Sequence, residues 1–313
     1  MSIDPASAVS RVLAQTTLPS DTFVTLSPHW GWLIALYFFL GGISGGAAFL
    51  AAMLHLFGRA EDRPMVRLGY LVAFVALLPC APLLIVDLNR PERFWHMIWQ
   101  SDSGGPMFKW WSPMSLGVWI ITLFAGILLL ALIGSWAGRV GLPKRLSSLA
   151  DGTLGKVVAA ATGLLGLFLA GYTGTLLTAT NRPLWADTPL LGLLFLLSGI
   201  SAAAAALLLL GWRRTHPASL SWLGQIDSYA MGLELAVLVV MVVTLGAVAT
   251  AVLGNGWGVA LLVGTVLLGT LVPLAAHVRP RLLGPATIPV AAVLGLAGSF
   301  VLRSVIVLAS EAV

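Results

Sequence analysis

Eight long apolar stretches constrain this chain more than any other feature of its sequence. A helix needs about 20 apolar residues to cross a bilayer, and each stretch is long enough. The predicted helices are Trp30–Phe57, Leu68–Asp87, Pro113–Ser135, Leu154–Thr178, Pro189–Trp212, Tyr229–Val252, Trp257–Ala276 and Ala286–Ala309. Because the runs do not alternate between apolar and polar residues, they predict an all-α integral membrane protein and not a closed β-barrel.

The composition supports the same class and excludes several others. Charged residues make up 9% of the chain, against about a quarter in soluble domains. Hydrophobic residues make up 58%, and the formal net charge of +5 is spread over separated positions. These values exclude an ordinary soluble enzyme, a disordered chain and a nucleic-acid binder. A single cysteine, Cys80, excludes internal disulfides, cysteine-ligated iron–sulfur clusters and a cysteine zinc site.

The basic residues predict an orientation. Eleven Lys and Arg residues follow the first, third, fifth and seventh predicted helices, whereas five lie on the other face. Positive charge gathers on the cytoplasmic side, so both termini are expected outside, in the periplasm of a Gram-negative cell. Residues 1–29 then form an exposed tail, and the first 27 lack the apolar core of a signal peptide. The outer loop Leu88–Ser112 is long and aromatic, which indicates either a functional loop or an aromatic belt.

Glycines and prolines predict local geometry in three places. Gly41, Gly42, Gly45 and Gly46 place small residues along one stripe of the first helix, where a neighbouring helix can approach closely. No strand precedes them, so a dinucleotide-binding loop is excluded. Pro79 and Pro82 should bend the second helix. Residues 254–256, Gly-Asn-Gly, should form a tight turn between the sixth and seventh helices.

Three polar residues from different helices are predicted at one depth, in the outer half of the membrane. They are Tyr37, Asp87 and Tyr172. Phenol and carboxylate groups suit a ligand that exchanges hydrogen bonds and protons at its oxygens. Alternatively, Asp87 caps a helix or pairs with Arg90 or Arg93, and the tyrosines are interfacial anchors.

Other polar residues lie within or beside the predicted spans. Glu234 and Arg303 are inside helices, and Asp227 is placed just before the sixth. They suit either a proton relay or mutual ion pairing. The five histidines form no pair at mid-depth, which argues against a membrane haem, and no cluster of residues indicates a metal site.

Four segments resemble the NrfD/PsrC family, the membrane subunit of polysulfide-reductase-like complexes. They are residues 37–47, the DLNRPERFW stretch 87–95, the SPMSLGVW stretch 112–119, and residues 172–174 with 181–185. The resemblance covers about residues 30 to 308. It implies two four-helix bundles: residues 30–178, which hold a quinone pocket and the outer loop, and residues 179–313.

The resemblance also implies a function. Such subunits carry no haem or cluster, sit in the bacterial inner membrane, and oxidise or reduce menaquinol or ubiquinol. They exchange electrons with a four-cluster ferredoxin-like iron–sulfur subunit, which is joined to a molybdopterin subunit or a multihaem cytochrome. Tyr172 matches a quinone-binding tyrosine, and Tyr37 stands where some relatives have a histidine. His29 or Asp87 is expected to supply the missing partner.

The resulting hypothesis gives each residue a role. Tyr37, Tyr172, His29 and Asp87 bind the quinone, with Asp87 and Tyr172 as the catalytic groups. A proton path would use Asp87, Glu234, Arg182 and Arg303. The partner would dock on Arg90, Glu92, Arg93, Trp95 and Trp110. The competing interpretations are a secondary transporter and a passive anchor of a redox complex without a quinone site.

Overall fold

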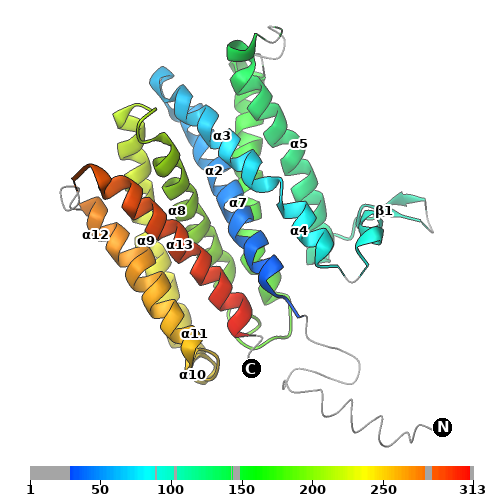
Figure 1. Ribbon diagram of the computed structural model, residues 1–313. Coiled ribbons are helices and arrows are strands. Elements are labelled where there is room, and N and C mark those ends of the chain that lie inside the picture. Colours follow the sequence, from blue (N-terminus) through cyan, green and yellow to red (C-terminus); the bar gives the residue numbers. More distant parts are fainter. Residues whose placement is uncertain are drawn as a thin grey trace, which may run out of the picture.

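The computed structural model describes residues 29–88, 90–101, 104–141, 143, 149–278 and 284–310. In this part of the chain, eight helical segments are long and apolar enough to cross a membrane, as predicted (Figure 1). The predicted tail lies outside the described residues except for His29. The same holds for five basic residues that entered the orientation, which therefore stays a prediction: Arg11, Lys144, Arg145, Arg279 and Arg281.

The first four spans contain five α-helices, with boundaries close to those predicted. They are α2 (Trp32–Phe57), α3 (Arg63–Leu77), α4 (Cys80–Val86), α5 (Pro113–Val140) and α7 (Gly152–Thr178). A 3-10 turn, η1 (Ala60–Asp62), precedes α3. The second span is therefore divided, because Pro79 interrupts it and α4 begins one residue later. The predicted bend is confirmed.

The last four spans contain six helical segments and one π-helical segment. They are α8 (Leu191–Gly211), α9 (Pro217–Leu245), α10 (Ala247–Leu253), α11 (Gly256–Val259), the π-helical η3 (Ala260–Leu271), α12 (Val272–Val278) and α13 (Thr287–Ala309). A 3-10 turn, η4 (Gly284–Ala286), precedes α13. The predicted turn at residues 254–256 is confirmed, and the Asn255 side chain caps α11 by accepting from the Trp257 amide at 2.8 Å.

The sixth span begins earlier than predicted. Helix α9 starts at Pro217 and not at Tyr229, so the prediction that Asp227 precedes the helix is wrong. The start has a physical cause in the sequence. His216 accepts a hydrogen bond from the Ala218 amide, and Pro217 occupies the first helical turn, where its missing N–H is harmless. Asp227 is consequently a buried residue of the helix.

Helix α2 lies at the centre of the structure and packs against α3, α7, α8 and α13. Its glycines allow this close approach. A Cβ at Gly45 would overlap the backbone of Gly166 on α7, and one at Gly46 would overlap Gly199 on α8. The predicted packing stripe is confirmed. The division into two four-helix bundles stays a prediction, since α2 has neighbours on both sides.

The loop Leu88–Ser112, which keeps the name outer loop from its predicted side, carries a short β-hairpin that the sequence did not predict. A 3-10 helix, η2 (Pro91–Met97), leads into β1 (Trp99–Gln100), which pairs antiparallel with β2 (Gly105–Pro106). The loop is attached to the bundle by Trp119, whose indole N–H donates to the Met107 carbonyl at 2.8 Å. Figure 1 shows it beside the end of α4.

Candidate functional site

A pocket of about 210 Å³ opens between α2, α4, α5, α7 and the outer loop. Its wall is mainly apolar, with side chains such as Ile34, Leu84, Met114 and Ile121. Three polar residues also line it: Tyr37 from α2, Asp87 at the end of α4, and Tyr172 from α7. The structure thus brings together the three side chains that the sequence placed at one depth.

Tyr37 is the most deeply buried of the three. Its side chain is almost fully covered and packs against Phe38, with ring centroids 5.4 Å apart. Its hydroxyl makes no hydrogen bond within the described part of the chain. A buried phenol usually finds a partner, so this hydroxyl retains capacity for a ligand in the pocket.

Tyr172 is held differently, because its hydroxyl donates to the Pro113 carbonyl at 2.5 Å. Pro113 opens α5, and the ring of Tyr172 lies over Gly117 one turn further along that helix. A Cβ at Gly117 would overlap the tyrosine ring. Sequence reasoning missed the role of Gly117, although the SPMSLGVW stretch contains it. The phenol oxygen of Tyr172 can still accept a hydrogen bond.

Asp87 is the C-cap residue of α4 and is half-buried at the mouth of the pocket. Among the described residues, its carboxylate has no ion pair or hydrogen bond, so the alternative pairing with Arg90 or Arg93 is absent. Burial raises the pKa of Asp87 above its ordinary value, because the charged form loses hydration. The group is therefore a stronger base than a surface aspartate.

His29 and Arg182 contact each other and do not line the pocket. The Arg182 guanidinium lies 2.8 Å from His29 Nδ1 and donates to the Ser310 carbonyl at 3.0 Å. It also lies over the Trp185 ring. These contacts join the start of α2, the α7–α8 connection and the end of α13. The pocket is reached instead by Trp30, which stacks on Trp185.

Glu234 and Arg303 belong to a second polar cluster, between α2, α8, α9 and α13. Arg303 is fully buried and donates to the carbonyls of Phe38 and Phe195, each at 3.1 Å. It also donates to the hydroxyls of two serines, Ser198 and Ser299. Glu234 is buried and interacts with Ser198 and with the charge of Arg303. Phe38 lines the pocket, so this cluster adjoins it.

Asp227 and His277 form a further contact nearer the other ends of the helices. The Asp227 carboxylate accepts from the Ser201 hydroxyl at 2.7 Å and lies 3.7 Å from His277 Nε2. Sequence reasoning gave these two residues no joint role, because 50 positions separate them and α9 was predicted to begin after Asp227.

The residues predicted to dock a partner lie together on the outer loop. Arg90, Glu92, Arg93 and Trp95 are exposed on and beside η2, and Trp110 is 71% exposed before α5. Aromatic and arginine side chains are enriched in protein interfaces. Across the described ranges, no group of three or more His, Cys, Asp or Glu side chains is arranged to hold a metal ion.

The spans and the pocket define a multi-pass integral membrane protein with an apolar pocket at one end of its helices. The sequence model of the family described as "Polysulphide reductase, NrfD" matches residues 22–313. The chain belongs to this family, as its motifs indicated.

Three relatives illustrate the likeness. The C subunit of the polysulfide reductase of Wolinella succinogenes is 32% identical over 191 residues, and protein NrfD of Escherichia coli is 31% identical over 194 residues. Each of these matches covers 58% of this chain and 58% of the relative, so the chain spans a little over half the length of these two proteins. A protein NrfD homolog of Haemophilus influenzae is 29% identical over 280 residues, covering 82% of this chain and 85% of the relative.

Proposed function

We propose that this chain is the quinone-binding membrane subunit of a respiratory oxidoreductase complex in the bacterial inner membrane. It oxidises menaquinol or ubiquinol, or reduces the quinone when electrons flow in the opposite direction. The observation that carries the proposal is an apolar pocket holding three polar groups: Tyr37, Asp87 and Tyr172. A quinone combines the same two features, since it has an apolar ring and tail and two polar oxygens. The names of the relatives, which include a polysulfide reductase subunit, support the placement in a reductase complex.

The two tyrosines are suited to different oxygens of the ligand. The Tyr37 hydroxyl has no partner in the described structure and can donate to a quinone oxygen or accept from a quinol hydroxyl. Tyr172 already donates to Pro113, so it offers a lone pair to the ligand. A hydroxyl that can only accept favours the quinol, which has protons to donate, over the quinone.

Asp87 serves as the proton acceptor in this proposal. Oxidation of a quinol releases two electrons and two protons, and the carboxylate at the mouth of the pocket takes the two protons one after the other and passes each to the outer water. Because burial raises the pKa of Asp87, its carboxylate takes a proton from a quinol hydroxyl more readily than a surface aspartate would. The two electrons leave through the outer loop to an iron–sulfur cluster of a partner, since quinol oxidation requires an acceptor.

We propose a four-cluster ferredoxin-like iron–sulfur subunit as that partner, together with a molybdopterin subunit or a multihaem cytochrome. It would dock on the exposed side chains of Arg90, Glu92, Arg93, Trp95 and Trp110. The chain would then be inactive alone. Because the loop residues Phe94, Met97 and Ile98 line the pocket, a docked partner would sit next to the quinone.

A second set of residues is proposed to support proton movement deeper in the bundle. Glu234 and Arg303 share Ser198, and Arg303 reaches the backbone of α2 beside the pocket. Arg182 contacts His29 near the start of α2. In this proposal, Glu234 carries the proton, the fixed positive charge of Arg303 lies beside it on the path, and Arg182 holds the outer end of the path.

The test uses the assembled complex with the substitution Tyr37→Phe. Loss of one hydrogen bond to the ligand should lower quinol turnover about fivefold and weaken binding of a quinone-analogue inhibitor by a similar factor. Tyr229→Phe is the matched control, because Tyr229 is exposed on α9 and distant in sequence from the pocket residues.

Three outcomes separate the alternatives. Equal turnover and inhibitor affinity in the two variants would remove Tyr37 from the site. Absence of any quinone-analogue binding to the wild-type complex would favour a passive anchor. Substrate flux in vesicles that contain this chain without partners would favour a secondary transporter.

A further inference from the structure

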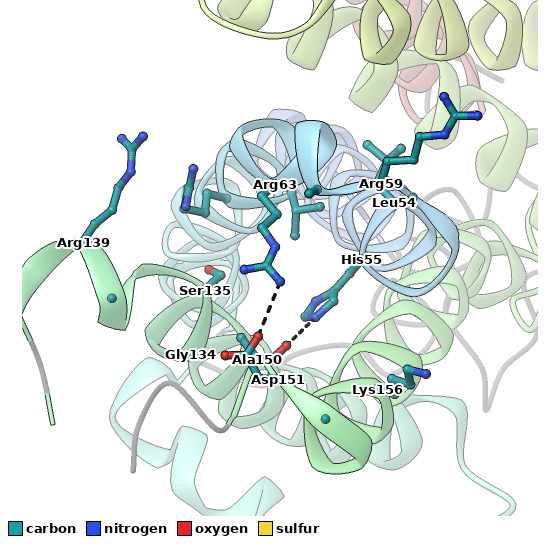
Figure 2. Close-up of a pocket in the computed structure, with 16 residues that line it drawn as sticks. Leu54, His55, Arg59, Arg63, Gly134, Ser135, Arg139, Ala150, Asp151 and Lys156 are labelled. Carbon is teal, nitrogen blue, oxygen red and sulfur yellow. Dashed lines mark hydrogen bonds and ion pairs between the residues drawn. The ribbon is translucent and has the colours of Figure 1, made fainter. Parts of the chain in front are cut away.

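A larger cavity lies at the opposite ends of the helices from the proposed quinone pocket. It has a volume of about 500 Å³ and is formed by the end of α2, the start of α3, the end of α5 and the start of α7 (Figure 2). Five basic side chains line it: Arg59, Arg63, Arg67, Arg139 and Lys156. A single acidic residue, Asp151, also lines it, so the cavity carries a clear excess of positive charge.

Most of this charge is not neutralised by the protein. Arg63 lies 3.7 Å from the Asp151 carboxylate, and Figure 2 shows this pair at the centre of the view. The four other basic side chains make no ion pair with any residue that the structure describes. Arg67 lies close enough to Arg63 and Arg139 to interact with their charges. Like charges held together repel, and a bound anion would relieve that repulsion.

The floor of the cavity is built from tight contacts. The His55 ring is fixed at both nitrogens, with Nε2 lying 2.9 Å from the Ala150 carbonyl and Nδ1 lying 3.1 Å from the Tyr70 hydroxyl. A Cβ at Gly134 or Gly155 would overlap the backbone of the turn at Ala150, so glycine is required for this approach. The basic side chains therefore surround a rigid base, and Figure 2 shows Arg139 and Lys156 on opposite sides of it.

Exposed apolar side chains adjoin the charged ones. Phe57 is 76% exposed at the end of α2, and Val157, directly after Lys156, is 59% exposed. Val140 follows Arg139 and is also exposed. On a membrane protein such side chains face acyl chains, and basic pockets between helices on the cytoplasmic side bind anionic head groups. A free inorganic anion would contact the basic side chains only, and the exposed apolar side chains beside them would stay uncovered.

We propose that this cavity binds the phosphate groups of an anionic phospholipid, with its acyl chains against the apolar ends of α2, α5 and α7. Because Arg139 and Lys156 flank the cavity from opposite sides, a head group with two phosphates, as in diphosphatidylglycerol, should bind more tightly than one with a single phosphate. The site is separate from the quinone pocket and does not depend on the function proposed for it.

The test measures lipid binding to the full, delipidated chain by native mass spectrometry. Titrations with diphosphatidylglycerol, phosphatidylglycerol and zwitterionic phosphatidylethanolamine should give decreasing affinity in that order. The double variant Arg67→Gln/Lys156→Gln should weaken diphosphatidylglycerol binding about 25-fold, since each basic residue near a head group contributes about a factor of five. Arg213→Gln/Arg214→Gln is the control, because it removes the same charge from the connection after α8, outside the cavity.

Several results would overturn the proposal. Equal affinity of the wild-type chain for the three lipids would contradict the proposal. This measurement needs no variant, so it decides the question even if a variant fails to fold. Equal losses in the two double variants would indicate a general charge effect. The third result concerns inorganic phosphate. If phosphate bound the wild-type chain and displaced each of the three lipids equally well, the cavity would be a site for a free anion.

Discussion

The proposed quinone pocket and the Arg303 cluster both place polar groups inside a membrane bundle, but they differ in how those groups are hydrogen-bonded. Arg303 is fully buried, and its guanidinium donates to three backbone carbonyls, those of Phe38, Phe195 and Ser299, and to two serine hydroxyls. In the pocket, Tyr37 and Asp87 have no hydrogen-bond partner among the described side chains. A buried polar group without a partner costs about 1–3 kcal/mol. The difference indicates a scaffold in one region and a ligand site in the other.

The two regions are also connected. Arg303 holds the carbonyl of Phe38, and Tyr37 is the preceding residue on α2. The hydrogen-bonded Arg303 cluster therefore fixes the part of the α2 backbone that carries Tyr37, whose hydroxyl has no partner in the described structure. A membrane bundle without water in its interior can hold a ligand-seeking group in place only if the supporting groups are themselves satisfied.

The largest expected effect follows from breaking the scaffold. Arg303→Met removes the guanidinium from the cluster and leaves Glu234, three carbonyls and two serines without their cation. Loss of one member of a buried charged cluster costs about 3–5 kcal/mol, so the variant should unfold far more readily in detergent. Thermal unfolding followed by circular dichroism measures this, with the exposed Arg214→Met as control. Equal unfolding temperatures in the two variants would contradict a scaffolding role.

Much of this architecture is readable from the sequence, because membrane helices obey simple rules. Unbroken apolar runs locate the spans, Pro79 locates the bend, and a Gly-Asn-Gly triplet locates the turn before α11. The shared depth of Tyr37, Asp87 and Tyr172 follows from counting residues along helices. These features depend on local sequence alone, so no tertiary information is needed to predict them.

Contacts between distant segments could not be predicted in this way. His29 meets Arg182 across 153 positions, and the π-helical turns of η3 leave no signal in an apolar sequence. The basic residues at the helix ends opposite the pocket were interpreted only as topology signals. Their cavity depends on how four helix ends are arranged, which charge counting does not describe.

The second prediction removes the proposed proton acceptor, Asp87, from the pocket. Asp87→Asn keeps the shape but cannot take a proton, so quinol turnover should fall about 100-fold. Because burial raises the pKa of Asp87, the wild-type rate should fall as the pH drops through that pKa and the carboxylate becomes protonated. The variant should lose this acidic limb. A pH–rate profile of the assembled complex measures both effects, and an unchanged profile would exclude Asp87 as the acceptor.

The same substitution has a defined effect on folding. For an acid whose pKa is raised in the folded state, the contribution to stability is full below the pKa of the unfolded chain and is lost as the pH rises through the folded-state pKa. An asparagine never ionises, so Asp87→Asn should be as stable as the wild type in acid and slightly more stable at neutral pH. A loss of stability at neutral pH would instead indicate a structural role for the carboxylate.

The third prediction narrows the pocket without removing a polar group. Gly117→Ala places a methyl group where the Tyr172 ring lies, and overpacking of this kind costs about 1–3 kcal/mol. Quinone-analogue affinity should fall as Tyr172 is displaced. Gly126 is on the same helix, and a Cβ there meets nothing within 4 Å. Gly126→Ala should therefore stabilise the protein by up to about 1 kcal/mol and leave binding unchanged. Equal quinone-analogue affinity in the two variants would show that the position of the Tyr172 ring does not affect binding.

The smallest expected effect separates the two tyrosines of the pocket. Tyr172→Phe removes the hydrogen bond to Pro113, so the protein should lose about 1 kcal/mol of stability as well as some quinol turnover. Tyr37→Phe removes no bond from the described structure and removes the cost of a buried hydroxyl without a partner, so turnover should fall while the unfolding temperature rises slightly. Measuring both quantities for both variants distinguishes a phenol that is partly structural from one that serves the ligand alone. If Tyr37→Phe destabilised the protein as much as Tyr172→Phe, its hydroxyl would have an internal partner, and the contrast between pocket and scaffold would be lost.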